Sequence, residues 1–372
     1  MSFHNPKIFL NFLKSKKASE KNWQKNLSLF QTLDTFPLPD FSNCHLPDGR
    51  CSCMTPQGIC TTEHYILVTA YCNIKRFQKE LKNAQESKGT ESQKDSTQKL
   101  YDKIKSENVH PSCIMVFDKE SHRYLALLEL PDQNHVGGIT YDGTYIWIAK
   151  STSNCLSMIT EKDLNHLVKY LISKKTAPGK MQNIMSADAR NQIQHFQKEP
   201  VPSAKIDYFQ KEIPCDMTAS FVTFFSKRIW VGFCAPAGKK GMLCSFQIQK
   251  NPQEHKHPFS LIPDRKFKIP AKANGASFYE NQADGKSKIY LFLSISGGRK
   301  KASDMLIYRI KHAYPLLLHR FTLPPLLEES CIDADILYTL YESSSPAYRD
   351  VPGNSCPFPV DVVSMADVKN FL

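Results

Sequence analysis

One short pattern recurs along the chain and constrains its fold more than any other feature. In the clearest copy, a strand ending at Leu130-Pro131 leads to His135-Val-Gly-Gly, then to a strand, an Asp142-Gly143 turn and another strand. Proline ends a strand because it has no N–H to give to the ladder. Asp-Gly favours a tight turn between antiparallel strands. The pattern therefore predicts a repeated unit of short antiparallel strands.

Five junctions of this kind occur, and each begins where a strand ends in Leu-Pro or Ile-Pro. Apart from two insertions, they are spaced by roughly 50 residues with about four short strands each, which is the period of a β-propeller blade. The last unit supplies only three strands, and we expect residues 30–39 to add its outer strand and close the ring. Closure would leave no exposed sheet edge. The sequence thus predicts an all-β propeller with five blades, or six if an insertion hides a degenerate blade.

The insertions and the N-terminus set the expected domain plan. Residues 1–27 are expected to form a basic amphipathic helix, and residues 28–372 the propeller, with insertions at about 73–110 and 160–205. The first insertion is rich in Lys, Glu, Gln and Ser, which is typical of a helical or disordered segment. The second begins with apolar residues at helical spacing and continues as a polar stretch.

Net charge gives little support to a nucleic-acid function. The chain has a formal net charge of +12, but residues 1–27, 73–110 and 160–212 carry all but one of these charges. The basicity belongs to three peripheral segments and not to one patterned groove. We therefore expect no nucleic acid partner, and regard an acidic partner bound through these segments as an alternative.

The compartment follows from the absence of export signals. The N-terminal apolar run stops after three residues, which does not fit a signal peptide. No apolar run approaches the roughly 18 residues of a membrane span. We therefore expect a cytoplasmic chain without a transmembrane segment, in which most of the 12 cysteines are free thiols that pack as small apolar side chains.

Polar residues at the repeated junctions mark a candidate site. In a propeller, the link into each innermost strand and the loop between the second and third strands share one face. That face surrounds one mouth of the central channel, and a ring of polar side chains there suits a polar ligand. The alternative is a solvated channel mouth without a ligand. The candidates are Gln57, Tyr71, His135, Lys150, Asp216, Ser220, Asn274, Arg299, Glu328, Glu329, Glu342 and Tyr348.

Other motifs carry less weight. Gly58, Gly137, Gly138 and Gly275 are expected to let crowded innermost strands approach one another. Cys44, His45, Cys51 and Cys53 include the ligand types of zinc, but no Cys-x2-Cys pair is present, so we expect free thiols and no metal. The sequence contains no nucleotide-binding glycine loop, Gly-x-Ser-x-Gly or His-Glu-x-x-His motif, and it indicates no particular cofactor.

Six segments occur in a fixed order along the chain: Pro56-Gln-Gly-Ile, His135-Val-Gly-Gly-Ile, Thr218-Ala-Ser-Phe, Arg228-Ile-Trp-Val-Gly, Leu323-Pro-Pro-Leu-Leu-Glu-Glu and Tyr341-Glu-Ser-Ser-Ser. Together they resemble an uncharacterised β-propeller family common in Gram-positive bacteria. The resemblance spans about residues 28–365 apart from the insertions, and it implies the propeller fold without an activity. Segments matching Glu328-Glu329 and Glu342 are typical of that family, whose members are often exported. The blades are more distantly similar to lactonase-like and quinoprotein-like propellers, some of which are enzymes.

Three functions stay open at this point. The leading hypothesis is a non-catalytic propeller that binds a polar small molecule, glycan or peptide at the channel mouth. The first alternative is a lactonase-like or other hydrolase, in which Glu328, Glu329 or Glu342 acts as acid or base or holds a divalent cation. The second is a protein-interaction scaffold that uses its basic helices.

Overall fold

The computed structural model describes most of the chain. The described residues are 32–39, 45–46, 49–51, 53–86, 90–175, 203–205, 212–215, 217–251, 259–282, 287–311, 314–356, 360 and 362–372. The expected helix within residues 1–27 and the candidate Asp216 lie outside them. Among the described residues, no helix is long and apolar enough to cross a membrane.

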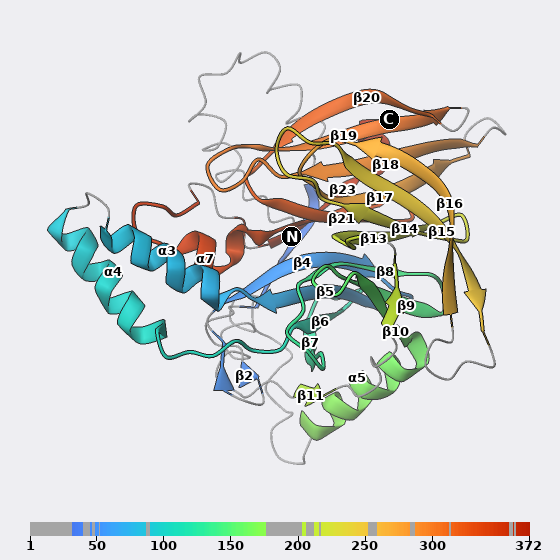
Figure 1. Ribbon diagram of the computed structural model, residues 1–372. Coiled ribbons are helices and arrows are strands. Elements are labelled where there is room, and N and C mark those ends of the chain that lie inside the picture. The colour runs from blue at the N-terminus through green and yellow to red at the C-terminus, as the bar shows by residue number, and fades with distance from the viewer. Residues whose placement is uncertain are drawn as a thin grey trace.

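Five antiparallel sheets form a five-bladed β-propeller, as the repeat predicts (Figure 1). Within each blade the strands are joined in chain order from the innermost strand outward. Blade 1 contains β4 (Met54–Thr61), β5 (Tyr65–Cys72), β6 (Cys113–Asp118) and β7 (Tyr124–Glu129). It also has an outermost strand that the repeat did not predict, β11 (Ser203–Lys205), which pairs in parallel with β7.

Blades 2, 3 and 4 have four strands each. Blade 2 consists of β8 (Val136–Tyr141), β9 (Tyr145–Lys150), β10 (Cys155–Thr160) and β12 (Glu212–Pro214). Blade 3 consists of β13 (Phe221–Phe225), β14 (Arg228–Phe233), β15 (Gly241–Lys250) and β16 (Phe259–Ile269). Blade 4 consists of β17 (Ala273–Asn281), β18 (Lys288–Ile295), β19 (Ser303–Lys311) and β20 (Tyr314–Leu323).

Blade 5 joins the two ends of the chain. Its inner strands are β21 (Leu327–Asp333), β22 (Ile336–Tyr341) and β23 (Val362–Asp367). The outer strand is β1 (Thr32–Pro37), which pairs antiparallel with β23. This confirms the expected closure, in which an N-terminal strand covers the edge that the last unit leaves open.

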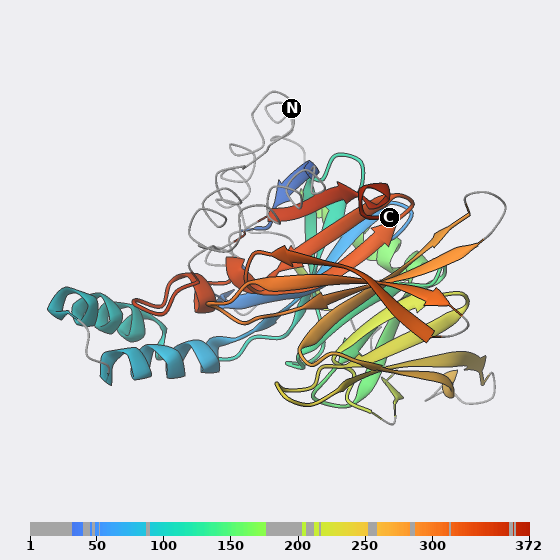
Figure 2. The same ribbon diagram turned by 90° about the horizontal axis from the view of Figure 1, so that it is seen from above.

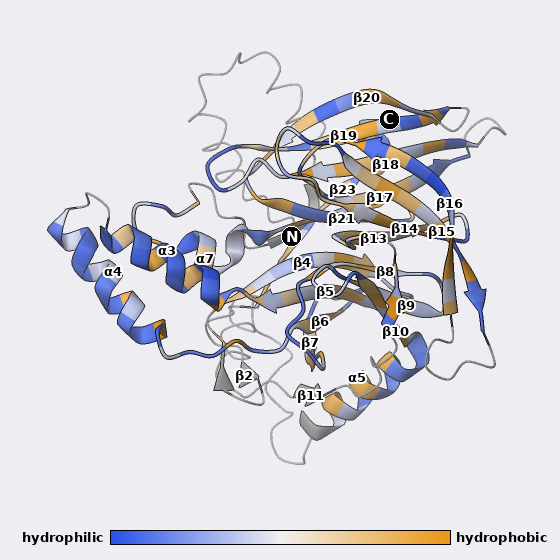
Figure 3. Ribbon diagram, viewed as in Figure 1, coloured by the Kyte–Doolittle hydropathy of each residue, from blue (hydrophilic) through white to orange (hydrophobic). Residues whose placement is uncertain are grey.

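The first insertion is helical. It consists of α3 (Ile74–Glu86) and α4 (Glu91–Ile104), which lie between the second and third strands of blade 1. Both helices extend away from the blades beside α7 (Pro346–Arg349), as Figures 1 and 2 show. Most of their surface is hydrophilic (Figure 3), and Ile74, Phe77 and Leu81 of α3 are buried. The helices are therefore held at their root and not along their length.

The remaining elements are short or peripheral. Helix α5 (Glu161–Lys175) begins the second insertion and packs Leu164, Val168 and Leu171 against blades 1 and 2. A small hairpin, β2 (His45–Leu46) and β3 (Gly49–Arg50), precedes blade 1. The 3-10 turn η5 (Glu342–Ser344) follows β22, and η6 (Val368–Phe371) follows β23.

The crowded centre of the propeller explains its glycines. A Cβ added at Gly58 would lie 2.7 Å from the Gly138 Cα, and one added at Gly275 would lie 2.8 Å from the Glu329 Cα. Real Cβ atoms do not approach this closely. The glycines therefore have the packing role that the sequence suggested.

Candidate ligand site at the channel mouth

The innermost strands carry a backbone irregularity at the same end of four blades. The register shifts between Pro56 and Gly58 in β4, and between Val136 and Gly138 in β8. Similar shifts occur between Ala273 and Gly275 in β17, and between Leu327 and Ser330 in β21. A bulge inserts an extra residue and re-aims its side chain. Here the extra positions include Gln57, Asn274 and Glu328, so the bulges position candidate site residues.

A chain of hydrogen bonds links three candidate residues, Glu342, Gln57 and His135, across blades 5, 1 and 2. Gln57 donates from Nε2 to Glu342 Oε1 at 2.6 Å, and its Oε1 contacts His135 Nε2. Because a carboxamide oxygen only accepts, this contact places the imidazole proton on Nε2. His135 Nδ1 is then left to accept from the Ser151 hydroxyl, 3.0 Å away. The imidazole is thus held in one neutral tautomer.

A second carboxylate lies in the same group. Asn274 donates from Nδ2 to Glu328 Oε2 at 2.7 Å, and the Cys234 thiol donates to Asn274 Oδ1 at 3.1 Å. Glu328 and Glu342 are both more than nine-tenths buried. Two carboxylates from different elements of blade 5 are therefore held mainly by neutral side-chain amides.

Burial determines the protonation of these groups. Desolvation raises the pKa of Glu328 well above its ordinary value, and the nearby Glu342 carboxylate adds to that rise. Burial also raises the pKa of Glu342, although hydrogen bonds from Gln57 and Tyr348 and the charge of Arg76 oppose it. Burial, with a smaller contribution from Arg76, lowers the pKa of His135 to about 4. The site therefore favours a neutral imidazole and disfavours two full negative charges.

Aromatic and cationic side chains border this group. The rings of Tyr71 and His135 have their centroids 4.3 Å apart. Arg76 donates to the Tyr348 hydroxyl at 2.8 Å, and the guanidinium carbons of Arg76 and Arg299 each lie 5.1 Å from the centroid of the Tyr348 ring. Burial raises the pKa of Tyr348, so its hydroxyl stays protonated.

Glu329 has a different position from its neighbour. Its Oε2 accepts from the backbone N–H groups of Ile59 at 3.0 Å and Ile139 at 3.4 Å, on the innermost strands of blades 1 and 2. Its Oε1 is buried without a hydrogen-bond partner. Burial raises the pKa of this carboxyl well above its ordinary value. Glu329 thus lies among the innermost strands, whereas Glu328 joins the amides at the mouth.

Three other predicted residues have partners outside the group. Lys150 is buried and paired with Asp132 and Glu212. Arg299 is paired with Glu80 of α3 as well as stacked on Tyr348. The Ser220 hydroxyl accepts from the Cys234 N–H at 3.0 Å.

Sequence reasoning missed two members of the site, Arg76 and Cys234. Arg76 belongs to a helix whose pattern resembles an ordinary solvated surface, and nothing local distinguishes it from neighbouring lysines. Cys234 follows β14 and lies near Glu328 and Glu342, whose charges add to the effect of burial and raise the pKa of its thiol to about 11. Its position at the end of a second strand was the one available signal.

A separate hollow of about 490 Å³ lies on blade 3. Its wall includes Met217, Phe233, Met242 and Phe246, with Asp264 and Arg265 among its polar residues. It is mainly apolar and holds none of the candidate residues. We therefore place the candidate site at the channel mouth.

Comparison with known proteins finds only distant likenesses. No family model matches the chain, and no curated protein matches it. Among solved structures, glutaminyl cyclase of Myxococcus xanthus shares 8% identity at a TM-score of 0.43, covering 91% of this chain and 97% of that one. A functionally unknown protein of Desulfotomaculum acetoxidans shares 8% identity at a TM-score of 0.34, and the match covers 77% of this chain and 65% of that one. Hydrazine synthase of Kuenenia stuttgartiensis shares 9% identity at a TM-score of 0.29, and the match covers 62% of this chain and 49% of that one.

These likenesses are too distant to indicate a substrate or a reaction. The resemblance to a Gram-positive family and to lactonase-like propellers stays a prediction.

Proposed function

We propose that the protein binds a polar small molecule, sugar or peptide at the channel mouth, through a protonated amine that the ligand places between Glu328 and Glu342. The observation that carries this proposal is the pair of buried carboxylates. Their ionisation is disfavoured by burial, and neutral amides are their principal hydrogen-bond partners. A cationic ligand group would favour the ionised forms and offset the desolvation.

The surroundings suit the rest of such a ligand. The partly exposed Asn274 offers an amide group for hydrogen bonds, and the ring of the partly exposed Tyr71 offers a flat apolar surface. Sites for polar ligands commonly combine a few convergent polar groups with aromatic walls. Arg76 and Arg299 add positive charge beside Tyr348 and Glu342, where it lowers the pKa of that carboxyl, and they would favour a ligand that also carries an anionic group.

Calorimetric titration tests this function. Amine-bearing ligands (amino acids, dipeptides, polyamines and amino sugars) are compared with neutral sugars of similar size. We expect binding only in the first set, weakened at least tenfold by Glu328→Gln or Glu342→Gln. Glu280→Gln, an exposed change at the far end of β17, serves as the matched control. Equal binding of neutral sugars, or no effect of either Gln variant, would overturn the proposal.

A hydrolase is the second candidate, favoured by one observation. The mouth holds a neutral imidazole beside carboxyls of raised pKa, which is the combination that general acid–base catalysis uses. A panel of ester, lactone and glycoside substrates tests it. Turnover that is lost in both His135→Gln and Glu328→Gln but kept in Glu280→Gln would establish an enzyme, and no turnover on any substrate would leave binding as the function.

A further inference from the structure

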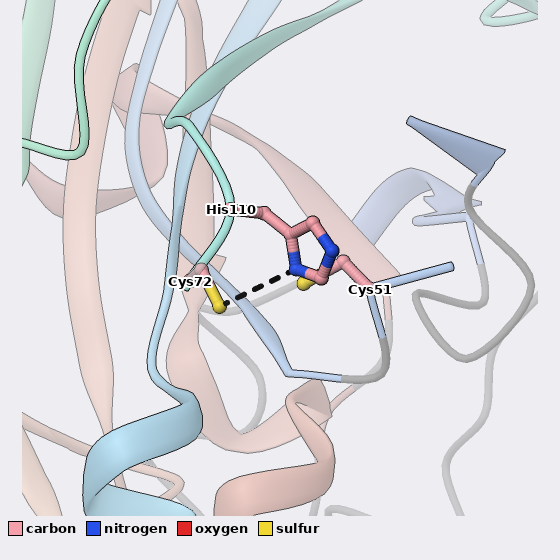
Figure 4. A group of neighbouring side chains, drawn as sticks. All are labelled: Cys51, Cys72 and His110. Atoms are coloured by element: carbon pink, nitrogen blue, oxygen red, sulfur yellow. Dashed lines mark hydrogen bonds between the residues drawn. The ribbon is translucent and has the colours of Figure 1, made fainter. Parts of the chain in front are cut away.

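Two thiols and an imidazole meet at a second place in the fold, away from the mouth carboxylates. Figure 4 shows Cys51, Cys72 and His110 with their side chains pointing toward one another. Their ligand-capable atoms all lie within 4.8 Å of one another, and the Cys72 Sγ is 3.9 Å from the His110 Nδ1. All three residues are more than nine-tenths buried.

The three residues come from three separate segments. Cys51 lies between β3 and β4, Cys72 is the last residue of β5, and His110 lies in the link from α4 to β6. Cys72 and His110 thus stand at the two ends of the helical insertion, 38 residues apart in sequence. The cluster joins the root of that insertion to the segment that enters blade 1.

We propose that Cys51, Cys72 and His110 bind a structural zinc ion. Thiolate and imidazole are the preferred ligands of zinc in closed structural sites. Tetrahedral zinc, with bonds of about 2.0–2.3 Å, holds its ligand atoms roughly 3.5–3.8 Å apart. The observed spacing therefore needs only small side-chain movements to admit the ion.

The fourth position has a candidate nearby. Cys53 is fully buried two residues from Cys51, although its thiol is not among the ligand atoms that lie within 4.8 Å of one another. Zinc would complete its tetrahedron with this thiol or with water. The sequence had grouped Cys51 and Cys53 with Cys44 and His45. Cys44 lies outside the described residues, and the distant Cys72 and His110 are the partners that only the fold supplies.

Other cysteines of the chain contrast with this cluster. Among the described residues, Cys60, Cys155 and Cys331 belong to no comparable group of ligand-capable atoms. They behave as small apolar side chains. Cys51 and Cys72, in comparison, have another thiol and an imidazole within reach, which is the setting of a ligand set and not of core packing.

A zinc ion here would stabilise the insertion against local unfolding. It would close the 38-residue segment at its base and so lower the entropy of the unfolded chain, as other cross-links do. Helix α3 begins two residues after Cys72 and carries Arg76, which donates to Tyr348 at the mouth. The ion would therefore also hold the helix that completes the candidate ligand site.

Metal analysis of the full chain tests this proposal without any mouth ligand. Protein purified under reducing conditions and dialysed against zinc should hold one zinc per chain by elemental mass spectrometry. Cobalt(II) in its place should give the intense thiolate-to-cobalt absorption of a tetrahedral site. Cys72→Ser and His110→Gln should each lower zinc affinity more than tenfold, whereas Cys155→Ser, a buried thiol of blade 2, should retain the metal.

The opposite results would overturn the proposal. One such result is a protein that binds no zinc and gives no cobalt–thiolate absorption. Another is a Cys51–Cys72 disulfide that persists after zinc loading. Equal zinc binding by Cys72→Ser and the parent would do the same. If a variant fails to fold, the cobalt spectrum of the parent chain decides the question.

Discussion

Arg76, on the first helical insertion, donates a hydrogen bond of 2.8 Å to the hydroxyl of Tyr348, which lies 272 residues further along the chain. The Tyr348 hydroxyl is also hydrogen-bonded to Glu342. One phenol thus connects the insertion to the carboxylate group at the channel mouth. This relationship makes helix α3 part of the site, although its sequence resembles a solvated helix.

A double-mutant cycle on this pair should detect the connection. Tyr348→Phe should lower the free energy of unfolding by about 2 kcal/mol, because it removes the hydrogen bonds of a buried hydroxyl to Arg76 and Glu342. Arg76→Gln should lower it by about 1 kcal/mol, because it removes the bond to Tyr348 and a half-exposed ion pair with Glu80. The double variant should lose less than the sum of the two, with a coupling of about 0.5–1 kcal/mol. Urea unfolding measures all four proteins. Tyr290→Phe, a buried change in β18, should show no coupling to Arg76→Gln.

The raised pKa of Glu329 predicts how stability depends on pH. A carboxyl whose pKa is higher in the folded state contributes stability below its unfolded value of about 4.5, and loses it as the pH rises through its folded value. Glu329→Gln keeps the acceptor for Ile59 but cannot ionise. We expect the variant to be at least as stable as the parent at pH 8 and to lack this decline. Urea midpoints between pH 4 and 9 test it, and a variant that unfolds more easily at pH 8 would contradict it.

His135 should make the free energy of unfolding depend on pH in the opposite direction. Its pKa is lowered from 6.5 to about 4, so the neutral imidazole contributes stability above pH 6.5 that is lost as the pH falls toward 4. His135→Gln should remove this acid-side loss and leave the slope of the Glu329 carboxyl unchanged. The same urea series measures it, with Glu280→Gln as a control. An unchanged acid limb in His135→Gln would show that the imidazole is charged in the folded protein.

The packing of the innermost strands predicts a contrast between two glycines. Gly58→Ala would place a Cβ 2.7 Å from the Gly138 backbone and 2.8 Å from the Glu329 carboxylate. Overpacking of this kind should cost about 3 kcal/mol of unfolding free energy. Gly238 has open space around it but a φ of +82°, so Gly238→Ala should cost about 1 kcal/mol of unfolding free energy through backbone strain alone. Thermal and urea unfolding should rank the two variants, and equal losses would argue against crowding at the centre.

Closure of the ring by β1 predicts the effect of truncation. Removal of residues 1–31 keeps β1, whereas removal of residues 1–38 deletes it and leaves β23 as an open edge. The longer deletion also removes Phe36, which is 3% exposed and whose burial contributes about 3 kcal/mol. We expect the shorter deletion to resemble the parent and the longer one to aggregate during size-exclusion chromatography. A monomeric, equally stable longer deletion would contradict this role of β1.

Residue patterns predicted the architecture well because a propeller is built from local repeats. Each blade is defined by alternating apolar strands, by turns such as Asp142-Gly143 and by a proline that ends the outer strand. These signals act over a few residues, so they can be recognised without knowing what packs against them. The parallel strand β11 had no such signal, since three residues beside β7 form a strand only through that partner.

The residues of the candidate site likewise fall into those that the repeat predicts and those that only the fold brings together. Gln57, His135, Asn274 and Glu328 were expected at one mouth because the repeat itself places equivalent positions at one end of the innermost strands. Arg76 and Cys234 could not be selected, because their proximity to the carboxylates depends on how an insertion and a strand end are folded back. Lys150 was selected, but the structure pairs it with Asp132 and Glu212, contacts that its own strand does not indicate.

The sequence by itself determined the blade repeat and the closure by an N-terminal strand, and it predicts the face on which polar residues gather. These depend on periodicity, turn chemistry and strand order, all of which are local or repeated. Only the tertiary structure decided which polar residues touch, why Glu328 and Glu329 have separate environments, and that Cys51, Cys72 and His110 meet. Such contacts depend on the close packing of segments far apart in the chain, and packing has no local signature.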